Sequence, residues 1–208
     1  MRSYGQYCGL ARSLEMIGDR WNLLIVRELL VSPARYRDLQ RGLHGIATNL
    51  LADRLRDLEA AGVLERRLSD NGQVVEYTLT PWGAQLREPI QGLIRWSLPL
   101  MIRGPEGDEF RPAWLSLVLP TLLAPRVPEP ETSAIGLDIG EELLRLVSGP
   151  AGYEVTPRGE DPVDATVQAD AHGLLGLASG ALSLDDALAL GLVRIDGDVS
   201  VVRTAFAA

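Results

Sequence analysis

Apolar residues recur at steps of three and four between Leu10 and Leu30, the spacing that puts them on one face of an amphipathic helix. Gly18 and Asp19 interrupt this stripe, so the pattern predicts two consecutive helices. The second is expected to end at Ser32, because a residue that precedes proline is pushed out of helical geometry. A short helix over residues 36–43 follows. The apolar positions of the first two helices are Leu10, Leu14, Ile17, Trp21, Leu24, Ile25 and Leu29.

The strongest helical pattern of the chain covers residues 46–61. Three leucines share one face of this predicted helix, and Gly62 follows it as the residue type that most readily ends a helix. Polar side chains occupy the opposite face, so the helix is expected to pack on one side only. The leucines are Leu51, Leu55 and Leu58, and the polar residues are Asn49, Asp53 and Arg56.

A β-hairpin is predicted directly after this helix. The runs 63–68 and 74–79 have β-prone composition, and the pair Asn71-Gly72 between them is a strong hairpin signal. Thr80-Pro81 then begins a long helix that is expected to run to about Arg103, bent or interrupted by Pro89 and Pro99.

The second half of the chain has a different pattern and begins after the breaker-rich segment 104–108. An apolar helix and a proline-rich turn (Pro125, Pro128 and Pro130) precede short alternating runs and two short helices, the second opened by Ser183 and Asp186 in a capping-box pattern. This order predicts an α+β domain with a small antiparallel sheet. The expected helices cover residues 114–123, 172–179 and 184–190, and the expected strands cover 135–139, 143–147 and 166–169.

Charge separates the same two halves. Residues 1–104 carry 14 arginines against 11 acidic side chains, whereas residues 105–208 carry 6 arginines against 17 acidic side chains. The sequence therefore divides into a domain over 1–104, a linker with a connecting helix over 105–131 and an α+β domain over 132–208. The net charge of −8 conceals a first half that is suited to an anionic partner.

Composition and motifs argue against an enzyme, a metalloprotein and a membrane protein. Cys8, His44 and His172 offer no zinc-ligand spacing, and neither a P-loop, a Gly-x-Gly-x-x-Gly motif nor a Gly-x-Ser-x-Gly elbow occurs. No apolar run is long enough to span a bilayer, and the N-terminus lacks the pattern of a signal peptide. We expect a cytoplasmic protein without a metal or a cofactor.

The order helix, short helix, patterned helix and hairpin is that of a winged helix-turn-helix, whose third helix enters the major groove of double-stranded DNA. Thr48, Asn49 and Arg56 supply hydrogen-bonding groups on its outer face, and Asp53 is either aimed at a cytosine amino group or paired with a neighbouring arginine. Contacts that position the DNA backbone or come from the wing are expected from Arg35, Tyr36, Arg37, Arg66, Arg67 and Asn71.

Several short motifs follow one another along the first half of the chain. They are Cys8, Ile17-Gly18-Asp19-Arg20-Trp21, Arg35-Tyr36-Arg37-Asp38-Leu39, Gly45-Ile46, the run from Leu55 to Gly62 and the run from Val75 to Gly83. In this order the motifs resemble the HxlR-type winged-helix transcriptional regulators. The resemblance implies a homodimer, with the first helix and the helix ending near Trp96 across a two-fold axis, and an operator that is an inverted repeat. Ala47 replaces a capping serine of the family, so Thr48 or Asn49 would have to cap the recognition helix.

Cys8 has two interpretations. Some members of the family use a cysteine here to sense oxidants or electrophiles, which requires an accessible thiol with a lowered pKa, and Arg12 lies one helical turn away. Alternatively, Cys8 is a small buried residue of the first helix.

Three segments of the last part of the chain form a recognisable pattern: the run from Asp161 to Val167, residues 174–180 and the run from Gly191 to Asp198. Together they resemble a sterol carrier protein-like domain, and the resemblance implies a helix after Asp198. Such domains enclose an apolar tunnel, which would suit a lipid-like or aromatic effector; the same leucines could also form only a core for dimerisation. The alternative for the whole chain is a small-molecule carrier or sensor whose winged helix serves protein interaction.

Overall fold

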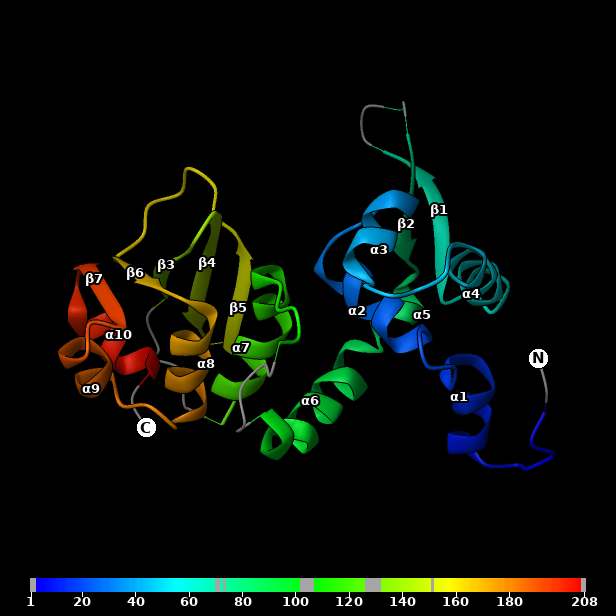
Figure 1. Ribbon diagram of the computed structural model, residues 1–208, viewed down its shortest axis with the longest axis horizontal. Helices are drawn as coiled ribbons and strands as arrows, with labels where there is room; N and C mark the ends of the chain where they lie inside the picture. The colour runs from blue at the N-terminus through cyan, green and yellow to red at the C-terminus, as the bar shows by residue number, and fades with distance from the viewer. Residues whose placement is uncertain are drawn as a thin grey trace. The chain divides into compact units, whose positions relative to one another are not determined.

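The computed structural model describes residues 3–69, 72, 74–101, 107–125, 132–150 and 152–206. The chain forms two compact units, Met1–Gly92 and Leu93–Ala208 (Figure 1). The charge pattern and the breaker-rich segment placed the division at residue 104, and the packing places it at Gly92 instead.

The first unit begins with four helices, as the hydrophobic pattern along residues 10–61 predicts. They are α1 (Gly9–Ile17), α2 (Asn22–Val31), α3 (Tyr36–Gly42) and α4 (Thr48–Ala60). Between α1 and α2, the backbone of Gly18 lies against the carbonyl group of Leu14. An added Cβ would be only 2.4 Å from that oxygen, so a side chain does not fit there without a shift. The core gathers leucines and isoleucines from α2, α3 and α4 and from the strand after them; its fully buried members include Ile25, Leu39, Leu51, Leu55, Leu58 and Leu64.

The two ends of α4 differ in how they are capped. Ala47 stands at the N-cap, where no side chain accepts a hydrogen bond from the first turn. The expectation that Thr48 or Asn49 would cap the helix is therefore wrong, because both are inside it or at its first position. At the other end Gly62 has φ of +73°, the left-handed backbone that glycine adopts without steric cost.

The hairpin is formed by β1 (Leu64–Leu68) and β2 (Val75–Leu79), which pair antiparallel with Leu64 opposite Leu79. Ala34, just before α3, adds a bridge to Tyr77 through two backbone hydrogen bonds of 3.1 and 2.8 Å. The segment before α3 is thus bonded to the hairpin β1–β2, which is the wing of the predicted winged helix-turn-helix. Asn71 lies outside the described residues.

The predicted long helix is two helices, α5 (Pro81–Ala84) and α6 (Arg87–Met101). The break falls at Gln85 and Leu86, just before Pro89, whereas Pro99 lies inside α6. The Thr80 hydroxyl caps α5 by accepting from the backbone N–H of Gly83 at 3.0 Å.

The second unit is built on a five-stranded sheet with the strand order β5-β4-β3-β6-β7. Because β3 and β6 pair in parallel, the sheet is mixed, and the prediction of a purely antiparallel sheet is wrong. A strand that the sequence pattern did not indicate, β5, forms one edge. The strands are β3 (Ser133–Ile139), β4 (Glu142–Gly149), β5 (Gly152–Pro157), β6 (Ala165–Ala169) and β7 (Val193–Gly197).

Helices cover one face of this sheet (Figure 1). A short 3-10 turn (Pro112–Trp114) leads into α7 (Leu115–Leu123), whose leucines join the core of the sheet, so this helix is part of the second unit and not of a linker. The remaining helices are α8 (Ala171–Ser179), α9 (Leu184–Ala189) and α10 (Val199–Phe206).

Two local predictions for this unit are confirmed. The Ser183 hydroxyl accepts from the Asp186 N–H at 3.1 Å, as the capping-box pattern requires. A helix follows Asp198 although its valines favour a strand, because Val202 and Phe206 bury one face of α10 in the core. Of the proline-rich turn, only Pro125 lies within the described residues. Within the described ranges, no helix is long and apolar enough to cross a membrane.

Candidate nucleic-acid interface

The outer face of α4 is polar and open to solvent. Thr48, Asn49 and Arg56 are exposed, and Asp53 is half exposed. Asn49, Asp53 and Arg56 lie opposite the buried leucines of the same helix, which fix its orientation in the unit. The structure therefore brings these three predicted recognition residues onto one exposed face, as the helical wheel indicated, and Thr48 is exposed at the first position of the helix.

Asp53 forms an ion pair with Arg56, one turn further along α4. Of the two predicted roles for Asp53, pairing with a neighbouring arginine is thus the one present in the structure. Both side chains are at least half exposed, so the pair contributes little to stability and can exchange its partners at low cost.

Tyr36 and Thr48 connect α3 to the beginning of α4. The Tyr36 hydroxyl donates to the Thr48 carbonyl oxygen at 2.7 Å, and the Gln40 side-chain amide donates to the Thr48 hydroxyl at 2.8 Å. Gln40 was not among the predicted residues, although its position one turn after Tyr36 puts it on the same face of α3. These two bonds connect α3 to the first residue of α4.

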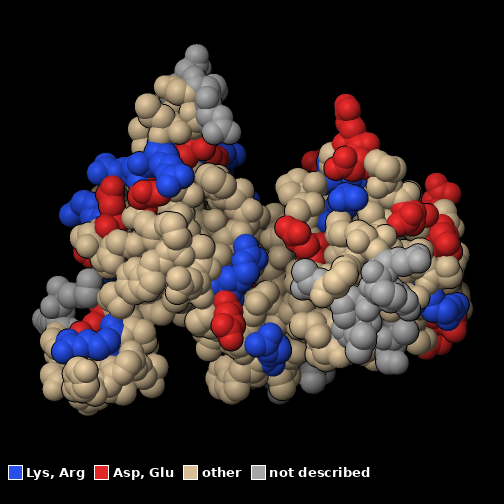
Figure 2. Space-filling view, turned by 180° about the vertical axis from the view of Figure 1, so that it is seen from behind, with Lys and Arg blue, Asp and Glu red and all other residues tan. Residues whose placement is uncertain are grey.

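Most arginines near the wing are already paired with acidic side chains. Arg35 lies 3.5 Å from Glu76 of β2, and Arg66 lies 2.9 Å from Glu59 of α4. Arg67 lies 2.5 Å from Glu65 on the same strand. Figure 2 shows basic and acidic side chains intermixed on this part of the first unit.

Arg37 differs from these arginines. It is exposed on α3, and within the described residues it has no ion pair. Among the arginines predicted to contact the DNA backbone, Arg37 can therefore bind a phosphate without first leaving an acidic side chain.

Where α4 meets the hairpin, the pKa values of two hairpin side chains are shifted by their surroundings. Hydrogen bonding to Glu59, and the charge of that carboxylate, raise the pKa of Arg66. Burial raises the pKa of Tyr77, which lies opposite Arg66 in the hairpin. Arg66 is thus a permanent cation and Tyr77 a neutral phenol at any physiological pH.

Cys8 is exposed and stands at the N-cap of α1, so the interpretation as a buried residue is wrong. The nearby backbone N–H groups of Ala11 and then Leu10, at the start of α1, lower the pKa of the thiol. Arg12 does not contribute, because its guanidinium bonds to Glu15 at 3.0 Å. In the described residues, no group of three or more His, Cys, Asp or Glu side chains is placed to hold a metal ion.

The helices α2 to α4, followed by a hairpin that packs beside them, define a winged helix-turn-helix unit. The model of the HxlR-like helix-turn-helix family matches residues 16–102. An HTH-type transcriptional regulator of Mycobacterium tuberculosis (strain H37Rv) is 32% identical over 158 residues, which cover 74% of this chain and 83% of that protein. YkvN, an HTH-type transcriptional regulator of Bacillus subtilis, is 33% identical over 90 residues, which cover 43% of this chain and 76% of YkvN.

Among solved structures, the reduced form of the transcriptional regulator YodB from B. subtilis is 31% identical, with a TM-score of 0.41, and the match covers 48% of this chain and 99% of that one. The chain belongs to the HxlR-like helix-turn-helix family of DNA-binding transcriptional regulators. The match to the mycobacterial protein is longer than the first unit, so that relative shares sequence with the second unit as well.

Proposed function

We propose that the chain binds an inverted-repeat operator as a homodimer, with α4 of each copy in a major groove. The observation that carries this proposal is the outer face of α4, where Asn49 and Arg56 are exposed opposite a fully buried leucine face. An amide side chain suits adenine and a guanidinium suits guanine, because each can form two hydrogen bonds to the edge of that base.

The remaining predicted residues have supporting roles in this proposal. Arg37 contacts a phosphate directly, and Arg35, Arg66 and Arg67 exchange their carboxylate partners for phosphates when DNA arrives. Tyr36 and Thr48 hold the recognition helix in its docking orientation. They contact DNA only through hydrogen-bonding capacity that their hydroxyl groups do not already use within the protein.

Exposed apolar side chains support the homodimer. Leu10 and Leu14 of α1 are 67% and 42% exposed, and Trp96 of α6 is 77% exposed. A contiguous exposed apolar surface commonly marks a site of protein–protein contact. A two-fold axis would place the two copies of α4 on successive turns of the duplex.

We further propose that the second unit binds a neutral apolar effector, as the resemblance to sterol carrier proteins implies. The helix α10 after Asp198 and a sheet with its helices on one face support this assignment. A role only in dimerisation is the alternative, and an effector acts only if it binds the DNA-competent and DNA-incompetent states with different affinity.

The test is selection of bound sequences from random duplex DNA, at two salt concentrations, with the full chain and with the variant Asn49→Ala/Arg56→Ala. We expect an inverted repeat whose enrichment disappears in the variant and weakens steeply with salt. Failure to enrich any motif at low salt would overturn operator binding by α4. It would instead favour the carrier or sensor interpretation, in which the second unit is the working part.

A further inference from the structure

In the part of the chain that the structure describes, helices cover only one face of the five-stranded sheet, and the other face, the polar face, carries polar side chains (Figure 1). Residues that are paired in register point to the same face of a sheet, so the pairing defines one row across all five strands. Because Ile135 and Leu137 of β3 belong to the core beneath the helices, Gly136 between them is on the polar face. The row on this face is Thr156, Arg145, Gly136, Thr166 and Asp196, from β5 to β7.

Arg158, the first residue after β5, extends across the polar face. Its backbone N–H donates to the Leu143 carbonyl oxygen at 2.9 Å. Its guanidinium lies over Gly136, where an added Cβ would be 2.7 Å from Nη1. Nη1 also donates to Oδ1 of Asp138 at 2.8 Å. The missing side chain at Gly136 thus makes room for the guanidinium, and Asp138 holds it there.

Arg145 is directly opposite Gly136, so a second cation shares the polar face with Arg158. Among the described residues Arg145 has no hydrogen bond and no ion pair, and its Nε atom is buried without an acceptor. A buried donor without an acceptor costs free energy, and the charge of Arg158 over Gly136 repels that of Arg145. An anion bound beside both guanidiniums would remove both costs.

The donors at this place specify an oxyanion. An arginine without a partner can form two parallel hydrogen bonds with a carboxylate or a phosphate. The Thr156 hydroxyl, next to Arg145 in the row, has no hydrogen-bond partner in the described ranges and adds a further donor. Arg145 and Arg158 carry two positive charges beside the single negative charge of Asp138. Glu154 is also on this face, but within the described residues it forms no ion pair.

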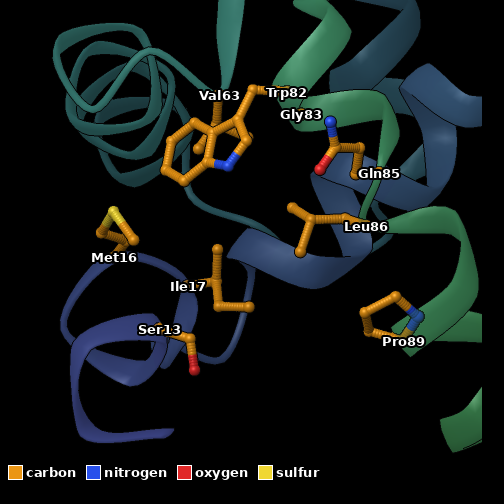
Figure 3. A pocket seen from close by; sticks show the side chains of 9 residues that line it. All are labelled: Ser13, Met16, Ile17, Val63, Trp82, Gly83, Gln85, Leu86 and Pro89. Atoms are coloured by element: carbon orange, nitrogen blue, oxygen red, sulfur yellow. The ribbon is translucent and has the colours of Figure 1, made fainter. Parts of the chain in front are cut away.

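The charge of the whole unit limits the ligand to a small molecule. Residues 105–208 carry 6 arginines against 17 acidic side chains, so a nucleic acid or an acidic protein surface would be repelled. A small oxyanion meets mainly the local charge of the two arginines. The hollow of the first unit that Figure 3 shows offers no such place, because none of the nine residues that line it is charged.

We infer that Arg145 and Arg158 bind the carboxylate or phosphate group of a small molecule on the polar face of the sheet. Arg145 supplies two parallel N–H donors, Arg158 supplies a second positive charge that Asp138 holds in place, and Thr156 supplies a hydroxyl group. The site lies on the face opposite the helices that support the apolar effector site. It depends neither on that effector nor on DNA binding.

The experiment is isothermal titration calorimetry of the full chain, at constant ionic strength and without DNA, with inorganic phosphate and separately with succinate. We expect one saturable site per chain for at least one of these anions. Succinamide, which has nearly the shape of succinate without its charge, should not bind. Saturation by only one of the two anions identifies which oxyanion the site takes.

Three variants locate the site. Arg145→Gln is expected to weaken binding at least about tenfold, because it removes one charge and the paired donors. Its thermal midpoint without ligand should not fall, since Arg145 has no partner to lose. Gly136→Ala keeps every charge but displaces the Arg158 guanidinium, and should weaken binding about threefold or more. The matched control is Arg203→Gln on α10, on the other side of the sheet, which removes the same charge and should leave binding unchanged.

Failure of both anions to saturate, equal binding by Arg145→Gln, or a loss of the same size in Arg203→Gln would each overturn the proposal. Binding of succinamide as tight as that of succinate would also overturn it, because the site would then not recognise charge. Unchanged binding in Gly136→Ala would overturn the role of Arg158. If neither anion binds and Arg145→Gln lowers the sedimentation coefficient, the polar face binds a second copy of the chain, and the proposal is equally wrong.

Discussion

Two helices of the first unit are exposed along one face, and their exposed faces are opposite in character. The outer face of α4 carries Asn49, Asp53 and Arg56, whereas that of α1 carries Leu10 and Leu14. Arg56 stays exposed to water at little energetic cost before DNA binds, since Asp53 already pairs with it. Exposed leucines gain only from apolar contact. We propose that α4 presents a surface for DNA and α1 a surface for a second copy of the chain, and mutations should separate the two.

The largest effect is expected from Leu10→Asp/Leu14→Asp on α1. Two carboxylates cannot be buried in an apolar contact, so the dimer should dissociate, which sedimentation equilibrium measures. Affinity for the inverted repeat should fall by about 10²-fold or more, because the second half-site no longer binds intramolecularly. Affinity for an isolated half-site should stay the same. Arg12→Gln is the control on the same helix, and an intact dimer in the double variant would rule out this surface.

The next largest effect is expected on α4. Arg56→Ala and Asn49→Ala should each cost about 1–3 kcal/mol of specific binding, since each removes a pair of hydrogen bonds to a base. Fluorescence anisotropy with operator and scrambled duplexes measures the difference. Both side chains are exposed, so the thermal midpoint should not change. Equal losses on both duplexes would assign these residues to the DNA backbone, and Arg194→Ala in the second unit is the control.

A smaller effect of opposite sign is expected from Glu59→Gln. The substitution removes the carboxylate that holds Arg66, so DNA affinity should rise a few-fold on any sequence. A plot of log affinity for DNA against log salt concentration should become steeper by ~0.9, the change expected for one additional phosphate contact. Binding titrations at several salt concentrations measure it. Glu88→Gln, on exposed α6, should change nothing, and the same result for Glu59→Gln would mean that Arg66 does not reach DNA.

The smallest effect concerns Cys8. Because backbone N–H groups of α1 lower the pKa of the thiol only while the helix is formed, the folded pKa lies below the unfolded one. The thiolate therefore favours the folded helix end, a contribution present above the unfolded pKa and lost as the pH falls through the folded pKa. Alkylation by iodoacetamide should reach half its maximal rate at a lower pH in the native chain than in urea. Coincident midpoints would refute this, and Cys8→Ser gives the background.

The first unit could be predicted closely because its elements are specified locally. Leucines at helical spacing, Gly62 and the hairpin signal each act within a few residues, and the four helices and the wing follow from them. The features that were predicted wrongly depend on contacts between residues far apart in the sequence. The exposure of Cys8 depends on which face of α1 finds a core, and the break at Gln85 depends on Gly83 packing against Val63.

The second unit was less predictable for the same reason. The edge strand β5 is bounded by Gly152 and Pro157, residues that normally indicate a loop, and it becomes a strand by pairing with β4. The parallel pairing of β3 with β6 joins segments that are separated by two other strands, so no local pattern could specify it. The α4 face itself was foreseen, but its ion pairs and the contribution of Gln40 required the geometry of neighbouring elements.

The parallel pairing of β3 with β6 also has a consequence for the chain as it leaves the ribosome. The hairpins β1–β2 and β3–β4 can form as soon as both of their strands have been synthesised. The other edge of β3 stays without a paired strand until β6 has been synthesised. A fragment that ends between the two would leave the central strand open to pairing with other molecules, a common route to aggregation. Nascent chains that stall in this interval should therefore depend on chaperones, while the winged helix ahead of them is already complete.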